Sequence, residues 1–504
     1  MMQTARGWAA PRWDQIVPSW PFIVGLAMFG RLLVEKRALL NDPDTYLHIA
    51  AGRWILAHWA LPVHDPFSHT MPGAVWISSE WLAQAAFAAV YDATGWSGVV
   101  LLSITVIAIA IGLMMRFLLR QLPPLPALIA TIAAAALLLP HMLVRPHVLA
   151  LPLLVVWTGS IIGARDAGRP PPFLVLPIMA VWTNVHGSFL VGIALAAYAV
   201  CEAVWQPRPG RTRTAEALSW GAFALAALLA ALVTPNGLAG LIQPIRLVRM
   251  PALQSIFVEW MSPNFQQSPA LDMWMLGLVF VGFSTGVRLP LPRLALVVGL
   301  VHMTLQHARH GDVLAIVAPL ALALPLASAL RDLTAAQPPS RLLAWTTRLD
   351  RPASVPAVVV TAVIALIAAL PTALYPIVRT DDAVTPGAAL AAAQRLGLTG
   401  PVYNSEAFGG YLIFRGVPSF IDGRVEMYGN DVIAKDYAAE EGSEAALHEL
   451  LQQHPVTWAL LLPNIGAAAV FARLPDWKKV YADDRAVVFA RTEPSAGQER
   501  PRSP

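Results

Sequence analysis

Long apolar runs are the feature that most constrains the fold of this chain of 504 residues. Hydrophobic residues make up 56% of it and charged residues 13%, against roughly 25% charged in a typical soluble domain. Many runs approach the length of about 17–25 residues that crosses a bilayer. Backbone groups in lipid must pair within their own segment, so these runs are expected to be helices. The alternating strands of outer-membrane barrels are not found. The sequence therefore predicts an α-helical polytopic membrane protein.

About eleven transmembrane helices are predicted. The first is expected to be retained, because Arg31 interrupts its apolar run and no small-residue cleavage site follows. The runs 172–185 and 294–306 are weak candidates, so partial helices are the alternative for those two. The predicted spans cover residues 18–38, 97–115, 124–140, 148–163, 172–185, 188–205, 216–233, 272–287, 294–306, 312–330 and 356–376.

The placement of arginines predicts the orientation, because cytoplasmic loops carry an excess of Lys and Arg. With Arg6 and Arg12 inside, most arginines of the later loops fall on the same side. The odd number of spans then puts residues 377–504 outside. Lys36 and Arg37 break the pattern at the outer end of the first span. They indicate either an error in that boundary or a functional cation pair.

The outer segment 41–96 is predicted to be more than a plain loop. Its stretches 45–59 and 80–91 show helical spacing and carry tryptophan, which favours the membrane interface. Two interfacial helices are therefore expected on the outer leaflet. The outer segment 235–271 holds a similar stretch, QPIRLVRMPALQSIFVEW.

The composition changes after the last span. In residues 377–495 charge rises and the apolar runs shorten, so a soluble α/β domain is expected there after the membrane domain 1–376. Residues 496–504 are expected to be a disordered tail. The segments PVYN, PSFID, VTWALLL and AVVFAR are predicted strands, and 386–396, 443–453 and 465–473 are predicted helices. Membrane lipids are expected partners, whereas the scattered arginines give nucleic-acid binding no support. Cys201 is the only cysteine, which excludes an intramolecular disulfide.

The first polar cluster follows the first span in NDPDTYLH. Asp42, Asp44 and His48 lie there, and Asp65 and Glu80 come later in the same segment. Carboxylates at a membrane surface can bind a divalent metal, accept a proton from a sugar hydroxyl, or cap a helix. Capping remains the alternative to chemistry, since Asp44 directly precedes a helical run.

A second cluster is predicted on the same outer face. Asn184 and His186 lie between two apolar runs, where polar groups are costly unless they face protein or a water-filled cavity. Arg145, Arg309 and His310 join them. Arginine and histidine there can grip a phosphate. The alternatives are a hydrogen bond between helices for Asn184 and snorkelling to the interface for the cations.

A third cluster lies in the soluble segment, in NSEAFGGYLIFRGVPSFIDGRVEMYG. Gly409 and Gly410 permit a tight backbone path. The surrounding aromatic and charged residues form a possible sugar-contact surface, and a glycine turn with an internal Asp–Arg pair is the alternative. The candidate residues are Tyr411, Asp422, Arg424 and Glu426.

Taken together, these motifs resemble the GT-C superfamily of membrane glycosyltransferases. An acidic motif opens the first outer loop of that superfamily, two juxtamembrane helices follow, and a soluble domain often ends the chain. Asp42-Pro43-Asp44 stands where the acidic motif belongs. The phrase DPDTYLHIAAGRWILAHW, and the GGYLI and FIDGR patterns of the tail, look like an uncharacterised bacterial group of this type. The layout is similar to that of protein O-mannosyltransferases and aminoarabinose transferases. The WWD motif of oligosaccharyltransferases is missing, which disfavours that activity.

The resemblance implies a transferase at the periplasmic face of a bacterial inner membrane. It would move a sugar from a polyprenyl-phosphate donor to a lipid, glycan or protein of the envelope, with inversion at the anomeric carbon. Asp44 or Asp42 would be the base, and either nearby cations or a Mg²⁺ or Mn²⁺ ion at this pair would stabilise the leaving phosphate.

Two other functions compete with this one. A transporter or lipid flippase would show internal repeats and polar residues near mid-membrane, and neither is found. A non-catalytic membrane scaffold with a periplasmic binding domain would make the outer carboxylates dispensable.

Overall fold

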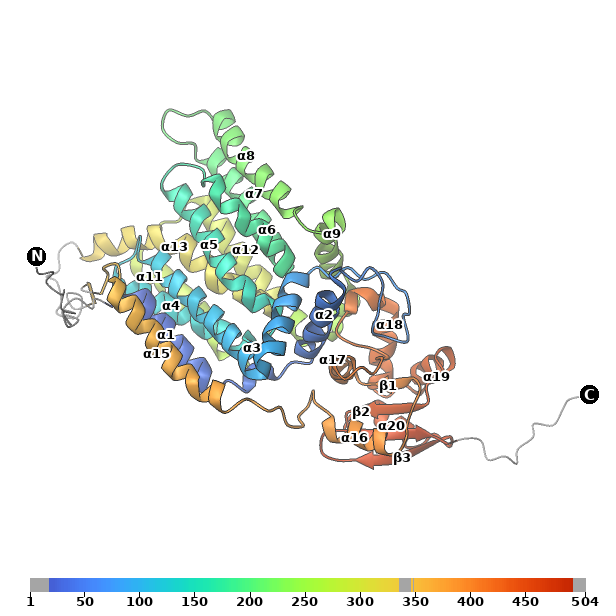
Figure 1. Cartoon of the computed structure of the whole chain (residues 1–504). Coiled ribbons are helices and arrows are strands. Elements are labelled where there is room, and N and C mark those ends of the chain that lie inside the picture. Colours follow the sequence, from blue (N-terminus) through green and yellow to red (C-terminus); the bar gives the residue numbers. More distant parts are fainter. Residues whose placement is uncertain (1–17, 335–345, 348, 493–504) are drawn as a thin grey trace, which may run out of the picture.

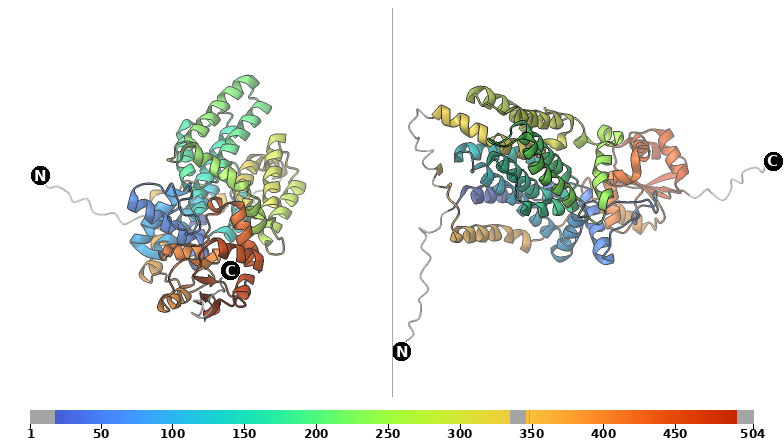
Figure 2. Two further views of the ribbon diagram at one scale, coloured as in Figure 1. Left: turned by 90° about the vertical axis from the view of Figure 1, so that its right-hand side faces the viewer. Right: turned by 90° about the horizontal axis from the view of Figure 1, so that it is seen from above.

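The computed structural model describes residues 18–334, 346–347 and 349–492. The predicted disordered tail 496–504 lies outside this range, as do Arg6 and Arg12, on which the predicted orientation partly rests. Figures 1 and 2 show the membrane helices side by side in one bundle, with a smaller body of helices and strands at one end of it.

Every predicted span corresponds to a helix. Among the described residues, six helices are long and apolar enough to cross a membrane, so the protein is a multi-span membrane protein. The total of eleven spans stays a prediction, since the other matching helices are shorter. The bundle comprises α1 (Trp20–Val34), α3 (Trp81–Leu118), α4 (Pro124–Leu138), α5 (Pro146–Asp166), α6 (Leu176–Val185), α7 (Phe189–Trp205), α8 (Arg213–Ala231), α11 (Pro269–Thr285), α12 (Leu291–Gln306), α13 (Gly311–Thr334) and α15 (Val355–Leu374).

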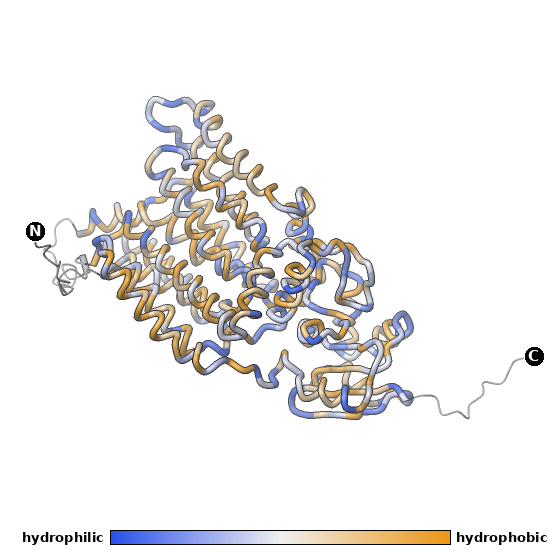
Figure 3. The backbone as a smooth tube through the Cα atoms, in the orientation of Figure 1, coloured by the Kyte–Doolittle hydropathy of each residue, from blue (hydrophilic) through white to orange (hydrophobic). Residues whose placement is uncertain are grey.

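The membrane helices are largely coloured as hydrophobic in Figure 3, and apolar side chains are exposed on the outside of the bundle as well as buried in its core. On α15, Leu366 is 71% exposed and Ile367 63%, and on α11 Phe283 is 88% exposed. Such surfaces are suited to lipid, because helices that satisfy their own backbone can turn apolar side chains outward in a bilayer.

The outer segments form helices close to the predicted ones. Residues 45–58 belong to α2 (Asp44–His58), and Trp59 follows its end. The stretches 80–91 and 97–115 form the single element α3, which bends at Gly95, where φ is +64°. Between α8 and α11 lie α9 (Gly237–Val248), α10 (Pro251–Ile256) and the 3₁₀ turn η5 (Val258–Trp260). The outer segments are thus mainly helical.

The tail contains a four-stranded mixed sheet in the order β1-β2-β4-β3. The strand β1 (Val402–Asn404) pairs parallel with β2 (Trp458–Leu461), and β4 (Val487–Arg491) runs antiparallel to β2 and to β3 (Trp477–Ala482). The prediction of a strand at PSFID is wrong, because these residues form a connection in which Ser419 bridges to Ser68 of the outer segment. The helices are α16 (Gly387–Arg395), α17 (Glu406–Phe414), α18 (Val425–Glu440), α19 (Glu444–Gln453) and α20 (Gly466–Phe471).

The tail shares a hydrophobic core with the outer segments. Trp76 and Leu253, from two different outer segments, are buried in one cluster with Phe420, Tyr428 and other tail residues. In Figure 1, α17 lies beside α2, and the two helices are in contact. The end of the membrane bundle is therefore covered by the tail, and the predicted acidic motif lies at this junction.

Candidate active site

Asp42 and Asp44 have different environments. The Oδ1 atom of Asp42 accepts a hydrogen bond of 2.8 Å from the backbone N–H of Asp44 at the start of α2. Asp42 is 1% exposed. The side chain of Asp44 is 21% exposed and points away from this helix start, toward Arg145. Capping, which the sequence suggested for Asp44, is thus provided by Asp42.

Arg145 joins three carboxylates. It directly precedes Pro146, which begins α5. Its Nε contacts Asp42, its Nη2 donates to Asp44 Oδ2 at 2.7 Å, and its Nη1 lies 3.2 Å from Glu259 Oε2. The planar guanidinium suits such multiple contacts, since its five N–H groups point in fixed directions. The predicted cation and the predicted acidic pair are therefore brought together.

Arg309 completes this polar cluster. Its Nη1 lies 3.3 Å from Glu259 Oε1, and its guanidinium carbon lies 4.2 Å from the centre of the Trp260 ring. The backbone N–H of Ala308 donates to Met261 O at 3.0 Å, which holds η5 beside the start of α13. Glu259 was not among the predicted site residues, because it lies in a stretch that the sequence marked only as interfacial. The cluster Asp42–Asp44–Arg145–Glu259–Arg309 is called the acid–arginine cluster below.

The histidines and Glu80 line the side of the cluster next to α3 and α6. His186 Nε2 lies 3.5 Å from Glu80 Oε1, and His48 Nδ1 lies 3.5 Å from the amide of Gln84. Asn184 accepts a hydrogen bond of 2.6 Å from Trp81 and donates one of 2.8 Å to Val233 O. Asn184 therefore links three helical segments. His310 lies 3.1 Å from Met303 O through its Nδ1, beside the ring of Trp260.

Burial changes the charge of these groups. It raises the pKa of Asp42 and Asp44, against the opposing effect of Arg145. Burial, with the negative charge of Glu426 adding to it, raises the pKa of Glu80 to about 8. Burial lowers the pKa of His48 to about 3. At neutral pH, Glu80 is thus mostly protonated and His48 is uncharged.

The tail candidates Asp422 and Arg424 form a buried ion cluster with Asp65. Arg424 lies 2.5 Å from Asp65 and 2.7 Å from Asp422, and none of the three side chains is more than 2% exposed. Tyr428 and Ser419 donate to the other oxygen of Asp422, at 2.7 and 2.9 Å. Burial opposes ionisation of Asp422, but Arg424 and these hydrogen bonds outweigh it and lower its pKa. The cluster fixes the tail to the outer segment.

Two tail glycines touch the acidic motif. A β-carbon at Gly423 would lie 2.9 Å from Asp44 Cγ and closer still to Oδ1. A β-carbon at Gly410 would lie 3.2 Å from the carbonyl carbon of Pro43 and would overlap its oxygen. The ring of Tyr411 packs edge-on against Tyr46 of α2 at 5.2 Å. The GGYLI and FIDGR patterns therefore form one wall around Asp44.

Two further tail carboxyls face this wall. Glu426 accepts a hydrogen bond from Trp76 at 3.3 Å, and burial raises its pKa. Glu406, at the start of α17, was not predicted from the sequence. Burial, and then the negative charge of Asp44, raise the pKa of Glu406 well above its ordinary value. Only its place before the GGYLI pattern could have marked it.

Lys36 and Arg37 lie apart from the acid–arginine cluster. Lys36 Nζ donates to Thr372 of α15 at 2.8 Å, and Arg37 is exposed. Within the described residues, neither side chain forms an ion pair with Asp42 or Asp44.

The predicted divalent cation at Asp42 and Asp44 stays a prediction, since the oxygens of this pair already have other partners. Arg145 contacts an oxygen of each, and the second oxygen of Asp42 accepts from the backbone. Over the described part of the chain, no three His, Cys, Asp or Glu side chains are placed to hold a metal ion. The positive charge next to the acidic pair is that of the guanidinium.

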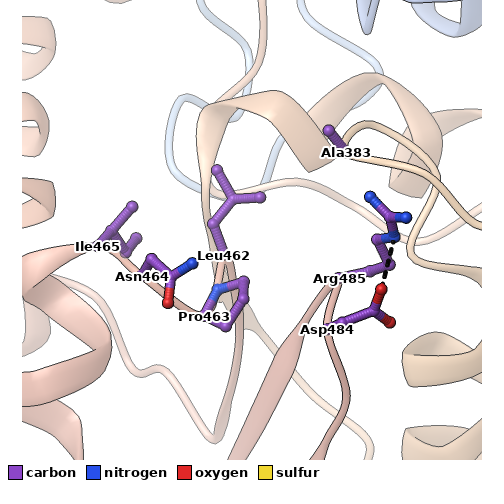
Figure 4. A pocket seen from close by; sticks show the side chains of 7 residues that line it. All are labelled: Ala383, Leu462, Pro463, Asn464, Ile465, Asp484 and Arg485. Atoms are coloured by element: carbon purple, nitrogen blue, oxygen red, sulfur yellow. Dashed lines mark ion pairs between the residues drawn. The ribbon is translucent and has the colours of Figure 1, made fainter.

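A separate hollow of about 220 Å³ lies on the tail (Figure 4). It is formed by the loop after β2, the turn between β3 and β4, and Ala383. It contains none of the predicted site residues. The acid–arginine cluster is therefore the candidate site.

Solved structures share the overall fold of this chain. The apo oligosaccharyltransferase of Archaeoglobus fulgidus superposes with a TM-score of 0.51 at 12% identity, over 87% of this chain and 69% of that one. The oligosaccharyltransferase AglB of the same organism, in complex with an inhibitory peptide and a dolichol-phosphate, gives 0.50 at 12% identity over 88% and 69%. The chain has a GT-C fold.

The GT-C resemblance seen in the sequence is thus confirmed at the level of the fold. The aminoarabinose transferase ArnT of Cupriavidus metallidurans, bound to undecaprenyl phosphate, matches 95% of this chain and 98% of its own length at 15% identity, with a TM-score of 0.47. No protein-family model and no curated protein sequence matches the chain.

Proposed function

We propose that this GT-C protein is a glycosyltransferase that moves a sugar from a polyprenyl-phosphate to an acceptor hydroxyl at the periplasmic face of a bacterial inner membrane. The observation that carries the proposal is the acid–arginine cluster, in which Asp44 and two arginines meet at the end of the membrane helices. A solved protein of the same fold holds dolichol-phosphate, a lipid of the same chemical class.

The donor would lie with its apolar chain against the bundle and its phosphate at Arg145 and Arg309. Arginine recognises phosphate oxygens through paired N–H donors and keeps its charge at every physiological pH. The membrane-facing surface supplies the apolar contact, as on α11 and α15. Glu80, protonated at neutral pH, is suited to donate a hydrogen bond to a sugar oxygen.

Asp44 is the better candidate for the base. Both oxygens of Asp42 are engaged, one by the backbone of residue 44 and one by Arg145, and the residue is buried. Asp44 is accessible and is held in place by Arg145 through Oδ2. Its raised pKa makes it a stronger base than a free aspartate, which is what proton abstraction requires. Asp42 would act as a positioning residue.

In the proposed step, the acceptor oxygen forms a bond to the anomeric carbon of the sugar while its proton passes to Asp44. The bond from that carbon to the phosphate oxygen breaks, and the lipid phosphate leaves with both electrons. Direct displacement gives inversion. Negative charge grows on the leaving oxygen, and Arg145 and Arg309 are placed to stabilise it. The acceptor would be a lipid, glycan or protein of the envelope.

The test is to compare Asp44→Asn with Asp42→Asn in a strain that lacks the gene. Envelope glycolipids and glycoproteins would be measured by mass spectrometry. Loss of a positioned base should reduce transfer by about 10²-fold or more in Asp44→Asn. Asp42→Asn should retain more activity, because an amide oxygen still accepts from the backbone of residue 44. Detergent-solubilised yield and melting report folding. A well-folded Asp44→Asn protein with full transfer would end the assignment of Asp44 as the base, and a strain with unchanged envelope glycans would end the assignment of transfer.

A further inference from the structure

Glu259 connects the two arginines of the site in an unusual way. Its Oε2 lies 3.2 Å from Arg145 Nη1, and its Oε1 lies 3.3 Å from Arg309 Nη1. One carboxylate thus offers a separate oxygen to each guanidinium. Arg309 and Arg145 outweigh the burial of Glu259 and lower its pKa, so it is charged at neutral pH.

These two contacts have the longest N···O distances of the acid–arginine cluster. Charge-assisted N–H···O bonds are usually about 2.7–2.9 Å long. Arg145 meets Asp44 at 2.7 Å, within that range, whereas both contacts of Glu259 exceed it. The side chain of Glu259 is 40% exposed, against 2% for Asp42. Glu259 is therefore the carboxylate that can leave Arg145 most easily.

The backbone around Glu259 does not have to move for this exchange. Its neighbour Trp260 is buried, stacks with Arg309, and accepts a 2.5 Å hydrogen bond from His307 through its carbonyl oxygen. Its other neighbour, Val258, is 79% exposed. The carboxylate of Glu259 can therefore swing outward about its own side-chain bonds while η5 stays anchored.

We propose that Glu259 takes the place of the donor phosphate in the free protein and keeps soluble phosphate from occupying the two arginines. The inference rests on the proposed function. A phosphodiester carries one negative charge and two free oxygens, as a carboxylate does. Replacing one by the other keeps both guanidiniums paired, which matters because an unpaired buried charge is strongly destabilising.

Soluble phosphate is kept out because every ligand must first displace Glu259. Soluble phosphate must break both contacts of Glu259 and gains only equivalent ones. A polyprenyl-phosphate gains the burial of its apolar chain in addition, at roughly 25 cal/mol per Å² of apolar surface. With Glu259 in place, the arginines are also never exposed without a counter-ion between reaction cycles.

The experiment measures binding of the methyl ester of undecaprenyl phosphate, a lipid-linked phosphodiester, to the full-length protein in nanodiscs of uncharged lipid. Glu259→Gln keeps the shape of the side chain and removes its charge. Because two partly exposed ion pairs are lost from the free state, affinity should rise about three- to tenfold. Inorganic phosphate should gain affinity for this variant by about the same factor, because it displaces the same carboxylate. Glu35→Gln is the matched control, since Glu35 is exposed and pairs with Arg31 instead. Its affinity should equal that of the wild type.

Arg309→Gln distinguishes failure of the proposed role of Glu259 from failure of the proposed phosphate site. Suppose that affinity is unchanged or lower in Glu259→Gln while binding is lost in Arg309→Gln. This result would overturn the proposal that Glu259 takes the place of the phosphate, and it would leave the phosphate site intact. Binding that is the same in Arg309→Gln and in the wild type, or absent from the wild type, would refute the phosphate site and the proposed function with it. Circular dichroism and melting of each variant show that it is folded.

Discussion

The contact between Gly423 and Asp44 gives the most specific prediction about the tail. In Gly423→Ala, the new methyl group would meet the carboxylate of Asp44, with Cγ at 2.9 Å and Oδ1 closer. The backbone of the FIDGR turn cannot yield, because Arg424 and Asp422 are fixed in the buried ion cluster. The short side chain of Asp44 must rotate instead and lose its 2.7 Å contact with Arg145.

The expected loss is large for activity and small for stability. A shift of about 1 Å in a reacting group can cost about 10²-fold in rate. An off-rotamer side chain costs only about 0.5–1.5 kcal/mol, and Arg145 keeps Asp42 and Glu259 as partners. Gly423→Ala should therefore reduce kcat about 100-fold while the protein still melts cooperatively within a few degrees of the wild type.

Gly416→Ala is the matched control in the same part of the tail. Gly416 has φ +75°, and a β-carbon added to it would have no other atom within 4 Å, so alanine there meets only the strain of the left-handed backbone. That costs roughly 1–2 kcal/mol. The control should lose more stability than Gly423→Ala and keep its activity. The reasoning is refuted if Gly423→Ala loses no more activity than the control.

Three further predictions concern protonation, metal and orientation. Burial raises the pKa of Glu80 from 4.5 to about 8, so between these two pH values the folded state binds more protons than the unfolded one and stability falls as pH rises. Over this interval, the melting temperature of Glu80→Gln should fall less than that of the wild type. Equal slopes of melting temperature against pH in the two proteins would contradict the raised pKa. Because Arg145 already contacts Asp42 and Asp44, transfer should survive chelation of divalent cations. Activity lost on chelation and restored by Mg²⁺ or Mn²⁺ would count against that arrangement. A reporter that works only in the periplasm should be active when fused after Arg491, and activity of a cytoplasm-only reporter there would reverse the orientation.

The helices could be predicted from the sequence because their signal is local. A long run of apolar residues is buried in a bilayer or in a protein core, and this can be recognised without knowing the rest of the fold. Each predicted span accordingly corresponds to a helix. The strand β3 was missed because WKKVYA alternates weakly and is largely exposed. PSFID looked like a strand because it is apolar, but its apolar residues pack against the outer segment.

The site could be predicted only as a face of the membrane domain. Topology alone put Asp44, Arg145 and Arg309 on the same side, yet the contact between Asp44 and Arg145 joins parts of the chain 101 residues apart. No periodicity encodes such pairs. Glu259 carries no motif at all. The contact of Gly423 with Asp44 explains why glycine is needed in FIDGR, a reason that is visible only once the two segments are seen together.

The position of the tail also affects how the protein matures. Asp44 leaves the ribosome before Gly410, Gly423 and Arg424, which lie more than 300 residues further along the chain. Until these residues have docked on the outer segment, Asp44 lacks one of its walls. A chain whose tail has not yet docked would therefore lack part of the site of the proposed transferase. In that enzyme, docking of the tail would be the step that completes the site.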